Sequence, residues 1–159
     1  MFDIVLYQPE IPPNTGNIMR LCANAPARLH LIEPLGFSLD ERRLRRAGMD
    51  YRDMATVLRH RSLAACQEQL GERRWLAFTT RGQTRLTDCR FQAGDVLLFG
   101  RETAGLPESV LAALPPRQRL LIPQLPGARS LNLSNAVAIA LFEAWRQLDY
   151  AGALSPSPA

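Results

Sequence analysis

The sequence has 159 residues, 47% of them hydrophobic, and this size fits one domain with a substantial core. No apolar run approaches the ~20 residues that span a bilayer, and the first residues lack a basic signal region, so we expect a cytoplasmic protein without membrane contact. The formal net charge is +4, and all 19 basic residues are arginine. Three cysteines lie far apart and only two histidines occur, so we expect neither a disulfide framework nor a metal site.

The first predicted strand covers residues 3–7, a short apolar run. Residues 8–16 contain three prolines and predict a rigid, non-helical loop, because proline removes a donor and fixes φ. A helix should begin near Thr15 or Asn17 and end at Pro26.

An arginine-rich helix is predicted after a second strand at 28–33 and should end at Gly48. Its spacing places Arg42, Arg45 and Arg46 on one face. A guanidinium suits bidentate phosphate contacts, so this face either contacts nucleic acid or is a solvated helix face.

Strands and helices continue to alternate along the remaining chain. The predicted elements are a strand at 55–59, a helix through Leu70 that Ser62 caps and Gly71 ends, and strands at 75–79 and 95–99 with a loop at 80–85 between them. A helix from Pro107 to Leu114 and a strand at 119–122 follow. This alternation predicts an α/β domain with a parallel sheet and helices on both faces.

The final predicted helix carries one apolar stripe, at Leu133, Val137, Leu141, Trp145 and Leu148. Several alanines flatten its surface, which suits close packing on another helix, including one from a second subunit. Residues 151–159 should form a disordered tail.

Three loops leave the carboxyl ends of late strands, at 78–80, 100–105 and 122–135. Each alone could be an ordinary turn, but together they predict a ligand pocket at the sheet edge. No GxGxxG motif follows the first strand and no GxxxxGK[ST] motif occurs, which disfavours a dinucleotide or triphosphate held by these devices.

Candidate catalytic groups are sparse in the sequence. There is no Ser/His/Asp set and no nucleophilic Cys/His pair, and His30 and His60 are best explained as structural residues. Any chemistry should therefore depend on a reactive cofactor. Arg20 lies in an apolar helical turn and either forms an ion pair, with Glu102 or Glu143, or contacts a substrate.

Three segments carry a family resemblance, at 14–20 (NTGNIMR), 98–107 (LFGRETAGLP) and 122–136. In order and spacing they resemble the motifs of SPOUT-class RNA ribose 2′-O-methyltransferases. The similarity is greatest to the minimal one-domain subfamily that modifies the wobble nucleotide of tRNA, and it includes residues 9–13 and 44–51.

This resemblance implies one domain over residues 1–150 with a deep trefoil knot at about 75–148. It implies methyl transfer from S-adenosylmethionine, with S-adenosylhomocysteine as product, to the 2′-OH of nucleotide 34. That nucleotide is cytidine or modified uridine in the anticodon stem-loop, in tRNA-Leu isoacceptors. A homodimer through the first and last helices is also implied. The alternatives are another RNA target and a non-catalytic knotted RNA-binding protein.

The resemblance also implies site residues by position. The catalytic residues would be Arg20, Asn14, Ser130 and Asn132. The cofactor contacts would be Phe78, Thr79, Gly100, Glu102, Ile122, Leu125, Ser130 and Leu131. Contacts to RNA would come from Arg20, Arg42, Arg45 and Arg46.

The role of Arg20 has two readings. The family proposal makes this arginine a general base, but a guanidinium stays protonated in proteins, which favours phosphate and alkoxide stabilisation. The sequence departs from the family at Phe142, where tyrosine is common, and at Arg101 and Ala104, where proline and arginine occur.

Overall fold

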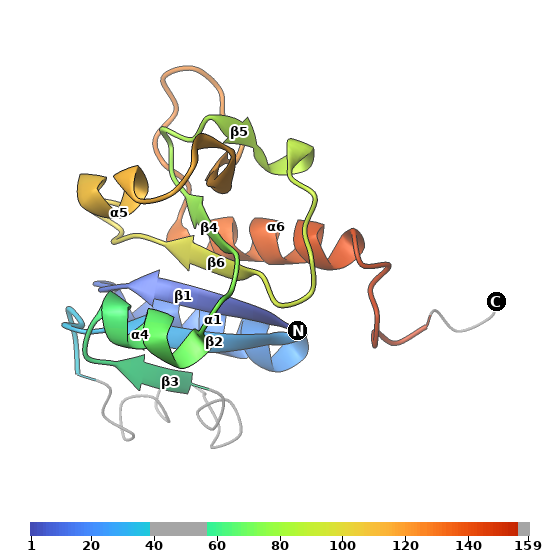
Figure 1. Ribbon diagram of the computed structural model, residues 1–159, viewed down its shortest axis with the longest axis horizontal. Coiled ribbons are helices and arrows are strands. Elements are labelled where there is room, and N and C mark those ends of the chain that lie inside the picture. Colours follow the sequence, from blue (N-terminus) through green and yellow to red (C-terminus); the bar gives the residue numbers. More distant parts are fainter. Residues whose placement is uncertain (39–56, 156–159) are drawn as a thin grey trace.

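The computed structural model describes residues 1–38 and 57–155 (Figure 1). The predicted arginine-rich helix, with Arg42, Arg45 and Arg46, lies outside these residues. Within the described ranges, no helix is long and apolar enough to cross a membrane.

A seven-stranded sheet forms the centre of the domain, in the order β3-β2-β1-β6-β4-β7-β5. All pairings between its neighbouring strands are parallel, which confirms the predicted α/β class. The strands are β1 (Phe2–Tyr7), β2 (Ala27–Ile32), β3 (Val57–His60), β4 (Trp75–Phe78), β5 (Thr84–Arg85), β6 (Val96–Phe99) and β7 (Arg119–Leu121).

Helices cover both faces of the sheet (Figure 1). The helices are α1 (Pro12–Asn24), α4 (Leu63–Leu70), α5 (Glu108–Ala112) and α6 (Leu133–Arg146), with short 3₁₀ turns at Leu86–Asp88 and Pro116–Gln118. Helices α1 and α6 pack on one face, while α4 and α5 pack on the other. Because side chains alternate along a strand, β1 sends Phe2, Ile4 and Leu6 to the first core and Val5 to the second.

The start of α1 corrects the prediction for residues 8–16. The helix begins at Pro12, so the expectation of a non-helical segment is wrong for residues 12–16. Prolines are tolerated in the first helical turn because its N–H groups have no intrahelical partner. The N-cap is Ile11, without a side-chain cap, so neither Thr15 nor Asn17 starts the helix.

The predicted apolar stripe of α6 is confirmed for Leu133, Val137, Leu141 and Trp145, which are all buried. Leu148 lies beyond the end of the helix and is only partly buried against the same core. The alanine surface serves the chain itself, because Ala140 and Ala144 are fully buried in the core shared with α1. The exposed apolar residues of α6 are instead Ile139 and Phe142, at 41% and 45% exposure.

Smaller differences concern the ends of elements. Residues 84–85 form β5, although we expected a loop there. Pro107 is the N-cap of α5 rather than its first residue. The predicted Ser62 cap of α4 is confirmed, because its hydroxyl accepts a hydrogen bond from the N–H of Ala65 at 3.2 Å. The indole N–H of Trp145 donates to the carbonyl of Ala151 at 3.1 Å and fixes the turn after α6.

Candidate active site

A cavity of about 470 Å³ lies where β4, β6 and β7 end, which is within the size range of small-molecule sites. The three predicted loops converge on it, because β6, β4 and β7 are neighbours in the sheet. The start of α1 closes one side. Its lining includes Ile11, Asn14, Phe78, Thr79, Arg81, Phe99, Gly100, Arg101, Glu102, Thr103, Ile122, Gln124, Ser130, Leu131, Asn132 and Leu133.

Two aromatic rings and a tight loop shape the wall of the cavity. Phe78 and Phe99 stack with centroids 4.6 Å apart and planes 7° from parallel. The backbones of Arg101 and Gly105 exchange two hydrogen bonds, of 3.1 and 2.9 Å. A Cβ on Gly100 would lie 2.1 Å from the carbonyl carbon of Gly105, so only glycine fits there.

Three polar side chains from distant parts of the chain form a hydrogen-bonded series, which we call the rim network: Glu102, Asn14 and Asn132. The amide of Asn14 donates to the Glu102 carboxylate at 3.1 Å. The amide of Asn132 donates to the Asn14 carbonyl at 2.8 Å. The series therefore ties α1, the loop after β6 and the start of α6 together.

Glu102 also satisfies the backbone before α1. Its carboxylate accepts the N–H groups of Glu10 at 2.8 Å and Ile11 at 3.2 Å. A carboxylate near a helix N-terminus is favoured by the helix dipole. This contact explains how α1 begins without a side-chain cap from its own sequence.

A reciprocal contact joins the same two segments. Glu10 accepts hydrogen bonds from Thr103, at 2.7 Å from its hydroxyl and 3.1 Å from its backbone N–H. These bonds, led by the one from the hydroxyl, lower the pKa of Glu10. The loop after β6 is thus fastened to the segment before α1 from both sides.

Asn132 has a second function as the N-cap of α6. Its side-chain oxygen accepts the N–H of Ser134 at 2.9 Å and the N–H of Asn135 at 3.4 Å, as asparagine commonly does at this position. Both ends of its amide are therefore engaged, one with α6 and one with Asn14.

The structure brings together most of the residues that the family resemblance implied. The cavity lining contains Asn14, Phe78, Thr79, Gly100, Glu102, Ile122, Ser130, Leu131 and Asn132. Leu125 is 82% exposed and is not among the lining residues. Arg20 is exposed on α1 and is likewise outside the lining.

The sequence analysis assigned no role to Glu10 and Ile11, because the proline-rich segment was interpreted as a rigid, non-helical loop. Proline is favoured at the first helical position, so Pro12 could have indicated that a helix begins there and that Ile11 precedes its first turn. Arg101 was noted only as a departure from the family. Its guanidinium lies 5.8 Å from the centroid of the Tyr7 ring, and it lines the cavity.

None of the three cysteines lines the cavity. Burial raises the pKa values of Cys22 and Cys66 to about 12, so neither thiol is a ready nucleophile at neutral pH. The structure therefore does not support a cysteine as the catalytic nucleophile at this cavity.

An open parallel sheet with a ligand cavity at the carboxyl ends of its strands is the architecture of α/β proteins that bind small ligands. The chain belongs to the SpoU rRNA methylase family, whose model matches residues 1–142.

A curated relative from Methylovorus glucosotrophus (strain SIP3-4) is named tRNA (cytidine(34)-2′-O)-methyltransferase. It is 56% identical over 154 residues, with 97% of this chain and 100% of the relative covered. A solved structure described as "Structural insights into the 2-OH methylation of C/U34 on tRNA" is 49% identical, with a TM-score of 0.86 and coverage of 94% and 97%.

A third similar protein is an AdoMet-bound rRNA methyltransferase from Sinorhizobium meliloti. It is 27% identical with a TM-score of 0.79, and the match covers 92% of this chain and 56% of that chain. The described part of the chain thus shares its fold with methyltransferases of this family.

Proposed function

We propose that this chain transfers a methyl group from S-adenosylmethionine to the ribose 2′-OH of nucleotide 34 in tRNA. The nucleotide is cytidine or modified uridine, and tRNA-Leu isoacceptors are the expected substrates. The observation that carries the proposal is the rim network, which joins three family segments around one cavity. The 56% identity to a relative named for this reaction supports the choice of substrate.

The residues present fit S-adenosylmethionine. The cavity combines apolar walls at Phe78, Ile122 and Leu131 with backbone at Gly100, where any side chain would collide with the next turn of the loop. Apolar walls with few polar groups suit an adenine ring. When bound, the cofactor supplies an electrophilic methyl on a sulfonium, and the protein must place the acceptor oxygen.

The two asparagines act by positioning. Asn14 is buried, and its amide is engaged at both ends, with Glu102 and with Asn132. They hold the start of α6 against the start of α1, and Ser130 lies exposed at the cavity nearby. We assign the Ser130 hydroxyl to contact with the ribose. Correct placement of an acceptor contributes up to ~7–11 kcal/mol to catalysis.

We assign an electrostatic role to Arg20. Its guanidinium stays cationic, so it can bind the phosphate beside the target ribose and stabilise negative charge as the 2′-OH loses its proton to water. Substitution Arg20→Lys keeps the charge and should retain measurable transfer. Complete loss of transfer in Arg20→Lys with unaltered tRNA affinity would contradict this role.

The active unit in our proposal is a homodimer through α1 and α6. Arg20 lies outside the lining of its own cavity, and the outer side of α6 exposes Ile139 and Phe142. Pairing of these faces would cover the apolar residues and bring Arg20 toward the partner's cavity. We also propose that the segment at about 75–148 forms the knot of the family.

Contact with tRNA would combine Arg20 with the arginines at 42, 45 and 46, together with Arg81 and Arg101 at the cavity. The net charge of +4 favours association with a polyanion. Both proposed substrates place the reaction in the cytoplasm.

The decisive test combines purified protein, S-adenosylmethionine and tRNA-Leu from a strain lacking the enzyme. Nuclease digestion with mass spectrometry should locate one new ribose methyl at nucleotide 34. A methyl at any other position, or only in rRNA, would redirect the proposal to another RNA target. Cofactor binding by calorimetry without methylation of any RNA would identify a non-catalytic binding protein. An Arg20→Ala variant provides the inactive control.

A further inference from the structure

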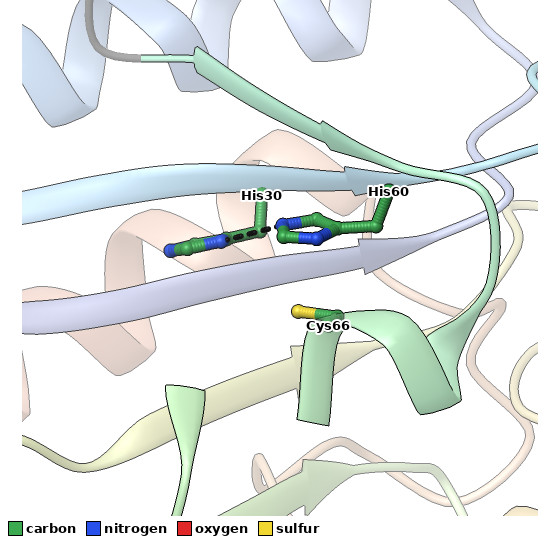
Figure 2. A group of neighbouring side chains, drawn as sticks. All are labelled: His30, His60 and Cys66. Carbon is green, nitrogen blue, oxygen red and sulfur yellow. Dashed lines mark hydrogen bonds between the residues drawn. The ribbon is translucent and has the colours of Figure 1, made fainter. Parts of the chain in front are cut away.

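A second polar cluster lies away from the cavity, on the face of the sheet that α4 covers (Figure 2). It consists of His30, His60 and Cys66, which we call the His-Cys cluster. Their ligand atoms all lie within 4.8 Å of one another. The three residues are 0%, 5% and 0% exposed, so the cluster is closed to solvent.

The fold assembles this cluster from three elements. His30 lies on β2, His60 ends β3, and Cys66 lies in the first half of α4. His60 pairs in register with Ile32, two residues beyond His30, so both imidazoles project to the same face. Figure 2 shows the Cys66 side chain on α4, next to the two rings.

The histidines are linked by one hydrogen bond, 2.9 Å long, between Nδ1 of His30 and Nε2 of His60. The other nitrogen of His30, Nε2, lies 3.0 Å from the carboxylate of Asp3. Asp3 is fixed in turn by Arg28 at 2.8 Å and Arg73 at 3.4 Å. With the Nε2 proton directed at Asp3, neutral His30 turns the lone pair of Nδ1 toward His60.

A carboxylate that accepts the distal N–H of a histidine is the usual support of a metal-binding imidazole, because it fixes the tautomer and raises ligand basicity. Asp3 provides this support without belonging to the group of three candidate ligands. It is a second observation, independent of the proximity of the three ligand atoms.

We propose that Nδ1 of His30, Nε2 of His60 and Sγ of Cys66 bind one thiophilic d¹⁰ ion, Zn²⁺ or Cu⁺. Thiolate with imidazole is the ligand set that these ions prefer. Bond lengths of about 2.0–2.3 Å imply ligand separations of roughly 3.3–3.8 Å. The two imidazole nitrogens, 2.9 Å apart, must therefore separate by about a few tenths of an ångström, and the sulfur, which lies within 4.8 Å of them, must approach by up to about 1 Å.

The protons balance in a simple way. The ion replaces the proton between the rings, which moves to Nδ1 of His60, and Cys66 binds as the thiolate and releases its proton. His30 keeps its Nε2 proton on Asp3. The bound ion would fasten the edge strand β3 and helix α4 to β2.

This site is distinct from the proposed active site, because none of its ligands lines the cavity. Its test therefore needs no methyl transfer, and its failure would leave the proposed function untouched. The residue spacing in the sequence predicted no metal site, since the two histidines and the cysteine belong to three separate elements.

The experiment uses the full chain, purified without a histidine tag, stripped with a chelator and then titrated. Co²⁺ serves as the spectroscopic probe for the Zn²⁺ arm, and Cu⁺ is titrated against a coloured chelator in the other arm. We expect one ion per chain in one arm, a thiolate-to-cobalt charge-transfer band if that arm is Zn²⁺, and a higher Tm with the preferred ion. Elemental analysis of the protein as purified gives the occupancy in cells.

The matched variants are Cys66→Ser and Cys89→Ser, since Cys89 is also buried but lies outside the cluster. The first should lose the ion and the Tm increase, and the second should keep both. Cys66→Ala with circular dichroism repeats the test if the serine variant folds poorly. Binding that is absent in both arms, or equal in Cys66→Ser and Cys89→Ser, would overturn the proposal.

Discussion

The two polar networks of this domain differ in where they lie relative to the sheet. The rim network of Glu102, Asn14 and Asn132 borders an open cavity at the carboxyl ends of the strands. The network of Asp3, His30 and His60 is enclosed between the sheet and α4.

The difference separates two uses of buried polarity. A network beside a cavity can hold loops in place while leaving room for a ligand, so its loss should affect activity most. An enclosed network must satisfy every polar group internally, because an unpaired buried group costs about 1–3 kcal/mol. Loss of the enclosed network should therefore affect stability most. A network closed to solvent has room for no ligand larger than an ion.

The largest effect is expected for Gly100→Ala at the cavity. Its Cβ would lie 2.1 Å from backbone of the same loop, so the wall must shift. We expect at least ~100-fold weaker binding of S-adenosylmethionine, measured by calorimetry, and a loss of about 1–3 kcal/mol in the free energy of unfolding. Gly152→Ala is the control for cofactor affinity, because Gly152 lies outside the cavity and its Cβ would contact nothing within 4 Å, while its φ of +82° also strains alanine there. Equal cofactor affinity in both variants would contradict the assigned wall.

The second effect is expected for Glu102→Gln, which keeps the shape of the side chain and removes its charge. The change weakens the contacts to Glu10, Ile11 and Asn14, and hydrogen bonds to charged groups contribute about 1.5–3 kcal/mol each. We expect kcat for methyl transfer to fall by roughly 10–100-fold, corresponding to about 1.4–2.8 kcal/mol. Glu68→Gln, exposed on α4 and outside the cavity lining, is the control and should leave kcat unchanged. If Glu102→Gln lost stability but kept its activity, Glu102 would serve stability alone, as we expect of the enclosed network.

The third prediction concerns Asp3→Asn in the enclosed network, measured in metal-free protein. Burial opposes ionisation of Asp3, but hydrogen bonds from His30 and then Arg28 outweigh it and lower the pKa of this carboxyl below its ordinary value. A carboxyl group whose pKa is lowered by folding stabilises the fold at pH values above its pKa in the unfolded chain, about 3.9. This stabilisation is lost as the pH falls through the pKa in the folded protein.

We therefore expect the free energy of unfolding of Asp3→Asn to be about 1–3 kcal/mol lower than that of the wild type at pH 7. It should also decline less steeply as the pH falls below ~4. Urea titrations between pH 3 and 7 measure both, with the exposed Asp88→Asn as control. Methyl transfer by the folded variant should stay near the wild-type value. A large loss of kcat would show that the two networks are coupled.

The smallest effect is expected for the ion pair of Arg81 with Glu108, 2.9 Å apart and 65% and 69% exposed. Exposed pairs contribute about 0–1 kcal/mol and are weakened by salt. A double-mutant cycle on thermal unfolding should give a coupling energy below ~1 kcal/mol that vanishes at 1 M salt. A larger coupling energy that does not depend on salt would mean that the Arg81 and Glu108 side chains are held more rigidly than their exposure suggests.

Local sequence patterns determined much of the fold. Apolar runs such as residues 96–99 predicted buried parallel strands, and the stripe from Leu133 to Trp145 predicted the buried face of α6. The cap at Ser62 and the stop at Gly71 followed from backbone chemistry. These features succeed because strand and helix periodicity depend on residues close together in the chain.

The start of α1 was harder to predict from the sequence, because its main support comes from Glu102, which is distant in the chain. Prolines at 12 and 13 argued against a helix until the structure placed them in its first turn. The alanine surface of α6 was predicted to pack closely on another helix, and Ala140 and Ala144 pack in the core shared with α1 of the same chain. Packing on a second subunit stays a prediction.

The sequence by itself determined the alternating α/β elements, the three loops of the cavity and, through family resemblance, the residues proposed for the reaction. Only the tertiary structure decided that Asn14, Glu102 and Asn132 are bonded to one another and that His30, His60 and Cys66 meet in the core. The physical reason is that periodicity reports which face a residue occupies. Which distant residues share that space depends on strand order and helix packing, and a single sequence encodes neither locally.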